Sequence, residues 1–209
     1  MNSLSVDATG LPDIGKHPYD TTCQRLRNRF RIEVPGDIDF KLEQFETLNH
    51  HQAVNIRNTF AIKNPCGDSY VLLLDTDTET KGINLKNNPA RKNTFQPWAL
   101  AYLKKDFGRV VIRTETIIDK IREVIFPIEL DLKEDKAFSN RFYVLTDDRH
   151  KTEAAMTKEF RDAIMSIKKA DFVIEIYEHT LIIGNHKPVT PENTLYLADF
   201  VARLAELKC

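Results

Sequence analysis

The segment VLLLDTDTET, residues 71–80, carries the clearest information about the fold. Four apolar residues run directly into carboxylates at every second position, Asp75, Asp77 and Glu79. A short apolar run favours a buried strand, and alternation with a period of two is typical of extended chain. We therefore expect a strand here, with its apolar part in the protein core.

The paired aspartates allow two interpretations. Their spacing resembles the first motif of the haloacid-dehalogenase-type phosphatases, in which one aspartate attacks phosphorus and the other transfers a proton beside magnesium. That chemistry requires the C-terminal end of a parallel strand with βα units around it, and the family has a threonine where this chain has Glu79. Because strand-end carboxylates are mostly exposed, we favour a solvated strand end and keep Asp75 and Asp77 as weak catalytic candidates.

Further strands are expected on both sides of this segment. Residues 53–64 (AVNIRNTFAIKN) are expected to form a hairpin with it across the turn signal at 65–68. Two more strands are expected at 97–105 (PWALAYLKK) and 109–115 (RVVIRTE), and the polar run 79–93 is expected to be a loop. An antiparallel sheet therefore fills the first half of the chain.

The apolar pattern changes in the second half. From Thr116 the period is 3.6 residues up to Pro127, which predicts a short helix. After it we expect a strand, a helix that restarts at the cap residue Thr157, a hairpin, and a closing helix capped by Thr190. These elements are expected at 138–145, around 156–167, at 172–187 and from 190 to 208.

The N-terminal region is expected to combine an irregular arm with a basic strand. Residues 1–20 mix Gly, Pro, Asp and Ser without a period. A period of two then favours a strand at about 29–34, while a short helix capped by Asp20 and ending near Asn28 fits the same residues. The alternating cations are Arg25, Arg27, Arg29 and Arg31.

These four arginines are a candidate anion-binding site. A strand would place several guanidinium groups on one face, where they could contact phosphate or carboxylate. The alternative is pairing with Asp37, Asp39 and Glu43, or solvation at a sheet edge. We favour the alternative, because a run of charges is usually a solvated face.

Composition excludes several classes of protein. The chain has 209 residues, of which 42% are hydrophobic and 29% charged, which is typical of one or two closely packed globular domains. A net charge of −1 provides no global field for nucleic acid, so we expect no nucleic-acid partner. No signal peptide and no run of about 18 apolar residues is present, so we expect no transmembrane segment.

Cysteine and histidine usage points to no cofactor. Cys23, Cys66 and Cys209 have no C-x-x-C spacing, which favours a reducing compartment and a cytoplasmic location. The histidines are scattered along the chain and give no set of three or four metal ligands. We therefore expect neither a metal site nor a bound cofactor.

A series of short motifs carries a resemblance to known sequences. In chain order they are VNIRNTF, YVLLLD, the strand at 94–103, RTE at 113–115, FSNRFYVLTDD, the hairpin FVIEIYEHTLIIG and the closing helix. Over about residues 40–208 the chain resembles uncharacterised bacterial proteins that carry a domain of unknown function. In them an apolar strand ends in an aspartate where Asp75 stands, which implies that Asp75 belongs to the fold rather than to phosphatase chemistry.

The resemblance implies no activity, cofactor or catalytic residue. Similar proteins often begin with transmembrane helices, so an association with a membrane is implied by the resemblance alone. We expect this chain to be a free-standing relative or a fragment, because it contains no such helix.

Together these patterns predict an α+β fold. It comprises an irregular arm (1–20), an antiparallel β-rich part (21–115) and a helix-strand-helix-hairpin-helix part (116–209), closely packed. With only seven glycines and no assembled site, the sequence favours a non-enzymatic interaction or scaffolding module with an unknown protein partner. The alternative is a metal-dependent phosphoryl hydrolase that uses Asp75 and Asp77.

Overall fold

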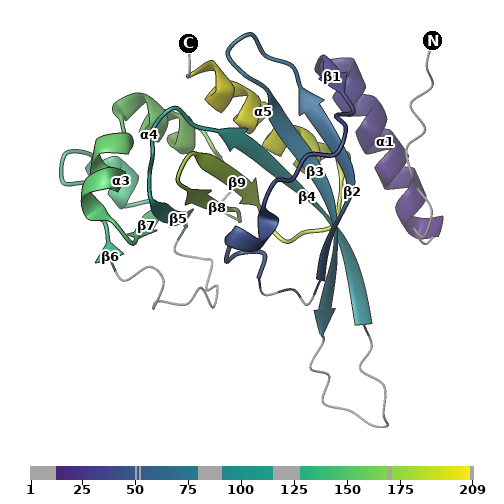
Figure 1. Ribbon diagram of the computed structural model, residues 1–209, viewed down its shortest axis with the longest axis horizontal. Coiled ribbons are helices and arrows are strands. Elements are labelled where there is room, and N and C mark those ends of the chain that lie inside the picture. Colours follow the sequence, from purple (N-terminus) through teal and green to yellow (C-terminus); the bar gives the residue numbers. More distant parts are fainter. Residues whose placement is uncertain are drawn as a thin grey trace.

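One antiparallel sheet forms the centre of the protein (Figure 1). The computed structural model describes residues 13–49, 51, 53–79, 91–114, 128–168 and 171–207. Within them nine strands pair in the order β1-β2-β3-β4-β9-β8-β5-β7-β6, and each neighbouring pair is antiparallel. With the helices that pack on this sheet, the α+β class predicted from the sequence is confirmed.

The strands differ greatly in length, and the short ones lie at the two edges. The edge strands are β1 (Ile32–Glu33) and β6 (Ile128–Glu129). The others are β2 (Ala53–Ile62), β3 (Ser69–Glu79), β4 (Arg91–Tyr102), β5 (Arg109–Arg113), β7 (Tyr143–Thr146), β8 (Val173–Tyr177) and β9 (Thr180–Gly184). The hairpins predicted at 53–79 and 172–187 are therefore confirmed.

Four helices in the second half begin at side-chain caps. Asp135, Asp148, Thr157 and Thr190 each accept a hydrogen bond from the backbone N–H three residues later, which satisfies a donor that the first helical turn leaves open. The caps at Thr157 and Thr190 are confirmed predictions. The helices are α1 (Asp13–Arg29), α2 (Lys136–Ser139), α3 (Arg149–Ala155), α4 (Lys158–Met165) and α5 (Pro191–Glu206), with a 3-10 turn η1 (Leu42–Gln44).

The N-terminal prediction was wrong for the irregular arm. Residues 13–29 form the helix α1, where we expected an arm to residue 20. The helix ending near Asn28, which the sequence left open as an alternative, is found, although it begins earlier than Asp20. Within the strand expected at about 29–34, only Ile32 and Glu33 are extended, in β1. The helix forms because Tyr19, Cys23 and Leu26 recur at helical spacing and are all buried. The alternation of the arginines with a period of two is incidental to this stripe.

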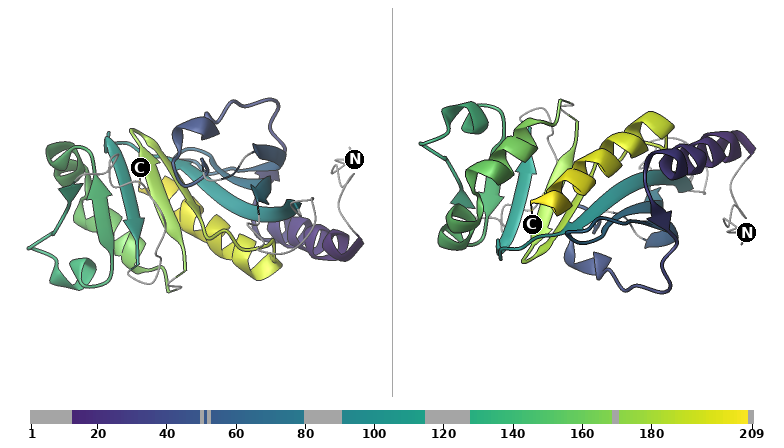
Figure 2. Two further views of the ribbon diagram at one scale, coloured as in Figure 1. Left: turned by 90° about the horizontal axis from the view of Figure 1, so that it is seen from below. Right: turned by 90° about the horizontal axis from the view of Figure 1, so that it is seen from above.

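Both faces of the sheet are covered, by different means. Val71 and Leu73 lie in the core that α1, α4 and α5 cover, whereas Leu72 and Leu74 lie in a second core on the opposite face. In Figure 2, α1 and α5 occupy one side of the sheet and the segment that carries η1 occupies the other. Among the described helices, none combines the length and apolar character needed to cross a membrane.

Some sequence expectations fall outside the described residues. These are most of the loop expected at 79–93 and the helix expected between Thr116 and Pro127. The division into parts near residue 115 stays a prediction, although strands from both sides of it join one sheet through the pairing of β4 with β9.

The two cysteines in the described residues differ in state. Cys23 is a free thiol in the core, and burial raises its pKa to about 11, so it stays protonated and unreactive. Cys66 is disulfide-bonded. Because disulfides persist mainly in oxidising compartments, Cys66 counts against the reducing compartment expected from the sequence, and the cytoplasmic location stays a prediction.

A buried glutamate attaches the η1 segment to the sheet. Glu175 in β8 accepts hydrogen bonds from the backbone N–H groups of Glu46 (2.9 Å) and Thr47 (2.8 Å) and from the Thr47 hydroxyl (2.8 Å). Phe45 and Leu48, on either side of these donors, fill the second core. Burial raises the pKa of Glu175 above its ordinary value of 4.5, and the hydrogen bonds only partly oppose this shift.

We predict a pH-dependent contribution from Glu175. Since its pKa is higher in the folded chain than in the unfolded chain, its contribution to the free energy of unfolding is complete below pH 4.5 and falls as pH rises through the raised pKa. Chemical denaturation from pH 7 to 5 should show the parent gaining stability relative to Glu175→Gln. The exposed Glu129→Gln is the control. If the parent lost stability relative to Glu175→Gln on acidification, the burial effect would be contradicted.

We also predict that Gly184 tolerates no side chain. A Cβ at this position would lie 2.4 Å from Cδ2 of Trp98, where β9 pairs with β4. Gly184→Ala should lower the free energy of unfolding by about 1–3 kcal/mol through overpacking. Gly36→Ala is the matched control, because a Cβ there meets nothing within 4 Å. Equal thermal stability of the two variants would show that Trp98 moves aside freely.

Candidate binding site

Asp75 lies in the middle of the sheet, not at a solvated strand end. Its side chain is only 14% exposed and pairs with Arg57, whose Nε and Nη2 donate to Oδ2 at 3.2 and 2.8 Å. The expectation of a carboxylate in water was therefore wrong for Asp75. Arg57 reaches it because a bulge between Ile56 and Asn58 interrupts the pairing of β2 with β3.

The strand context differs from that of a phosphatase motif. β3 pairs antiparallel with β2 and with β4, whereas the hydrolase alternative requires the end of a parallel strand. The backbone of Asp77 continues β3 opposite Asn93, and its side chain lies outside the described part. A role for Asp75 and Asp77 in catalysis stays a prediction, with Asp75 occupied by Arg57 in this structure.

The four candidate arginines lie on or just after α1. Nη1 of Arg25 pairs with Glu192 and Nε of Arg29 pairs with Asp199, both at 2.7 Å. Because the arginines are four residues apart, they lie on the same face of α1 and tie this helix to α5. Arg27 and Arg31 are exposed. The expected partners Asp37, Asp39 and Glu43 were wrong for Arg25 and Arg29.

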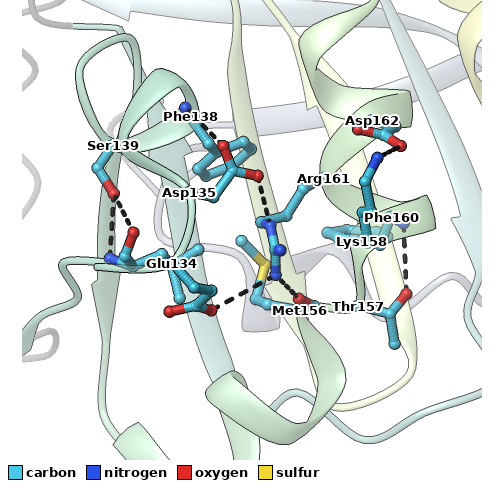
Figure 3. Close-up of polar contacts among 11 residues, drawn as sticks. Glu134, Asp135, Phe138, Ser139, Met156, Thr157, Lys158, Phe160, Arg161 and Asp162 are labelled. Atoms are coloured by element: carbon cyan, nitrogen blue, oxygen red, sulfur yellow. Dashed lines mark hydrogen bonds and ion pairs between the residues drawn. The ribbon is translucent and has the colours of Figure 1, made fainter.

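A further arginine, Arg161, was not indicated by the sequence patterns. It is buried and is the centre of a polar network (Figure 3). Arg161 in α4 donates from Nε to Asp135 at 2.8 Å and from Nη1 to the Met156 carbonyl at 2.6 Å. Glu134 approaches Nη1 to 3.7 Å. These contacts fix the start of α2 and the junction of α3 and α4 relative to one another.

Asp135 uses both carboxylate oxygens in this network. Oδ2 accepts from Arg161, and Oδ1 accepts from the backbone N–H of Phe138 at the start of α2. The hydrogen bond from Arg161 and then that from Phe138 lower the pKa of Asp135, so the pair stays charged at neutral pH. The sequence signal was weak, since one arginine in an amphipathic helix normally faces solvent.

An apolar pocket of about 300 Å³ lies next to this network. Three parts of the chain form it: the turn between β4 and β5, the α3–α4 junction, and the end of α5. Its apolar walls are Leu103, Phe107, Ala155, Phe160, Leu204 and Leu207. Leu207 is 45% exposed, so the pocket opens to solvent beside a large apolar side chain.

Polar contacts hold the β4–β5 turn in place at the pocket. Asp106 accepts from the Gly108 N–H at 2.8 Å and from Lys151 Nζ at 2.9 Å, and these bonds, in that order, lower its pKa. Lys105 donates to the Ala154 carbonyl at 2.7 Å. The neighbouring Lys104 lines the pocket and is exposed. The exposed Glu159 of α4 lines the pocket as well, so the rim carries both a cation and a carboxylate.

The described side chains do not gather into a metal centre. Among them, no group of three or more His, Cys, Asp or Glu residues could hold an ion. His51 and His186 lie against each other with ring centroids 5.6 Å apart, and His186 also packs against Trp98 at 5.1 Å. Both rings are thus part of the packing of the second core.

The comparisons with known proteins give a likeness in fold alone. No protein-family model matches the sequence, and no curated protein matches it. A solved structure, that of the mycobacterial trehalose monomycolate transport factor A (TtfA), superimposes with a TM-score of 0.55 at 10% identity. The match covers 91% of this chain and 92% of that one, so the two share their architecture over almost their full lengths.

We predict that Arg161 is essential for the rigidity of the α2–α4 region. Arg161→Met should lower the free energy of unfolding by about 1.5–3 kcal/mol, because it removes charged hydrogen bonds from a buried site. Lys158→Met is the matched control: Lys158 also pairs with an aspartate in α4, but both partners are exposed. Urea titration measures both. If the control lost as much stability as Arg161→Met, burial of the network would not matter.

Proposed function

We propose that the chain is a non-enzymatic binding module that holds an apolar segment of a protein partner in the pocket beside α5. The observation that carries this proposal is the pocket itself, where Phe107, Phe160 and Leu204 form a buried floor and Leu207 stands exposed at the opening. Exposed large apolar residues beside a concave apolar surface favour a recognition site.

The dimensions of the pocket indicate the kind of partner. About 300 Å³ is at the lower end of the range for ligand pockets. One or two large aliphatic or aromatic side chains would fill it. The rim carries both Lys104 and Glu159, so its charge favours neither an acidic nor a basic partner. The partner segment is therefore defined by one or two large apolar side chains.

The other observations are compatible with such an accessory role. The rim and floor are fixed by the Asp106 and Arg161 contacts, so little ordering is required when a partner binds. The shared architecture with a transport factor is compatible with a non-enzymatic accessory role. The hydrolase alternative gains no support from Asp75, which pairs with Arg57 in an antiparallel sheet.

The proposal predicts that binding of the partner protein depends on Leu207. The parent, Leu207→Lys and Ala137→Lys should be immobilised and exposed to extract of the native host, with bound proteins quantified by mass spectrometry. The partner is a protein that the immobilised parent binds from the extract. Its recovery should fall at least about tenfold with Leu207→Lys, since a hot-spot side chain contributes about 2 kcal/mol or more. Ala137→Lys is the matched control, because Ala137 is an exposed apolar residue in α2 that does not line the pocket.

Two outcomes would contradict the proposal. One is the absence of any protein whose recovery depends on Leu207. The other is magnesium-dependent turnover of a generic phosphate ester that disappears in both Asp75→Asn and Asp77→Asn, which would establish the hydrolase instead. Circular dichroism of each variant confirms that it is folded.

A further inference from the structure

A groove at the opposite end of the sheet has a different character from the pocket. It has a volume of about 550 Å³ and lies between residues 34–39 and residues 56–59 of β2. Val34 and Ile56, which line it, are 42% and 39% exposed. Among the described residues only Leu207, at the pocket, is another large apolar side chain with comparable exposure.

The backbone of β2 is open along this groove. β1 pairs with β2 only at Ala61 and Ile62, after which the chain leaves the sheet through Pro35. In the described part of the chain, no strand pairs with the outer edge of β2 from Ala53 to Phe60. The N–H and C=O groups that β2 directs away from β3, at alternate residues, thus have no strand partner within the described ranges and can pair with a further strand.

The usual protection of an edge strand is weak here. Natural edges carry lysine, proline or inward-pointing charges that discourage pairing. β2 contains neither lysine nor proline, and its one charged residue, Arg57, is held by Asp75. The bulge at Arg57 bends the strand, yet Ile56 beside it stays exposed. A strand edge of this composition favours pairing with a partner strand over exposure to water.

The charge around the groove indicates which partner fits. Asp37 and Asp39 are exposed on the segment that forms its outer wall. Within the described ranges, neither Asp37 nor Asp39 forms an ion pair, and Asp39 accepts a hydrogen bond from the backbone N–H of Lys41. Arg57 also lines the groove but is paired with Asp75, so the described lining residues leave these two carboxylates to attract cationic side chains.

We infer that the open edge of β2 is a docking site for an extended, basic segment of a partner protein, which adds to the sheet as a strand. Backbone hydrogen bonds to β2 supply affinity, and alternate side chains of the added strand supply specificity. Apolar side chains cover Val34 and Ile56, while lysine or arginine side chains pair with Asp37 and Asp39. This surface is separate from the Leu207 pocket and does not depend on it.

The test uses a fluorescent probe peptide of about eight residues in which lysine and valine alternate, the length of an ordinary strand. At low salt the probe should bind the parent chain, and amide exchange should slow at residues 53–59 when it binds. The double variant Asp37→Asn, Asp39→Asn should weaken binding about tenfold, because each exposed ion pair contributes up to about 1 kcal/mol. Ile56→Asn should weaken it as well.

Matched controls distinguish strand addition at this edge from general charge attraction and from binding at the pocket. Asp131→Asn removes an exposed carboxylate far from the groove, and Leu207→Lys alters only the pocket, so both should bind the probe like the parent. A peptide with proline in place of valine lacks the N–H groups that pair with β2 and should not bind.

Three results would overturn the inference. The first is a lack of probe binding to the parent. The second is binding without protection of residues 53–59, which would show charge attraction alone. The third is concentration-dependent dimerisation of the parent that protects the same amides without the probe, because the occupant would then be a second copy of this chain.

Discussion

Burial of the central strands on both faces is the constraint on which the rest of the structure depends. Val71, Leu72, Leu73 and Leu74 follow one another in β3, and none of them is exposed. Since side chains alternate along a strand, these residues supply apolar surface to both faces at once. Each buried side chain of this kind stabilises the fold by about 1.5–3 kcal/mol. A cover is therefore required on each side of the sheet.

The two covers explain where binding surfaces arise. Helices α1, α4 and α5 cover one face, and the segment with η1, fixed by Glu175, covers the other. Neither cover extends over the whole of the sheet and its helices. At the end of α5 this leaves the apolar pocket, and beyond β1 it leaves the open edge of β2. Both candidate sites therefore lie at the edge of the core, where apolar side chains stay exposed.

Local patterns in the sequence were sufficient to predict the hairpins and the capped helices. The turn at 65–68 and the residues Thr157 and Thr190 act on their immediate neighbours, so their effect is visible in a short window. The sequence left a strand and a helix open at α1 because two periods overlap there, and burial of Tyr19, Cys23 and Leu26 decided between them. Only the tertiary structure reveals such burial.

Candidate site residues were harder to predict because their partners are distant in sequence. The pairing of Arg29 with Asp199 joins helices 170 residues apart, and Glu175 lies 128 residues from Thr47. Arg57 contacts Asp75 only because of a bulge in β2, and no local sequence pattern indicates that bulge. Both candidate surfaces likewise combine separate parts of the chain, so composition and spacing could indicate a binding module but not its position.

Native-state hydrogen exchange tests the central claim, that one doubly covered sheet forms a single cooperative core. The pairing of β4 with β9 joins the two halves of the chain at Trp98 and Gly184. Amides of β3 and β4 should therefore exchange with the same opening free energy and the same denaturant dependence as those of β8 and β9, through global unfolding. If β8 and β9 opened at a distinctly lower free energy while β3 and β4 stayed protected, the core would be divided and the claim contradicted.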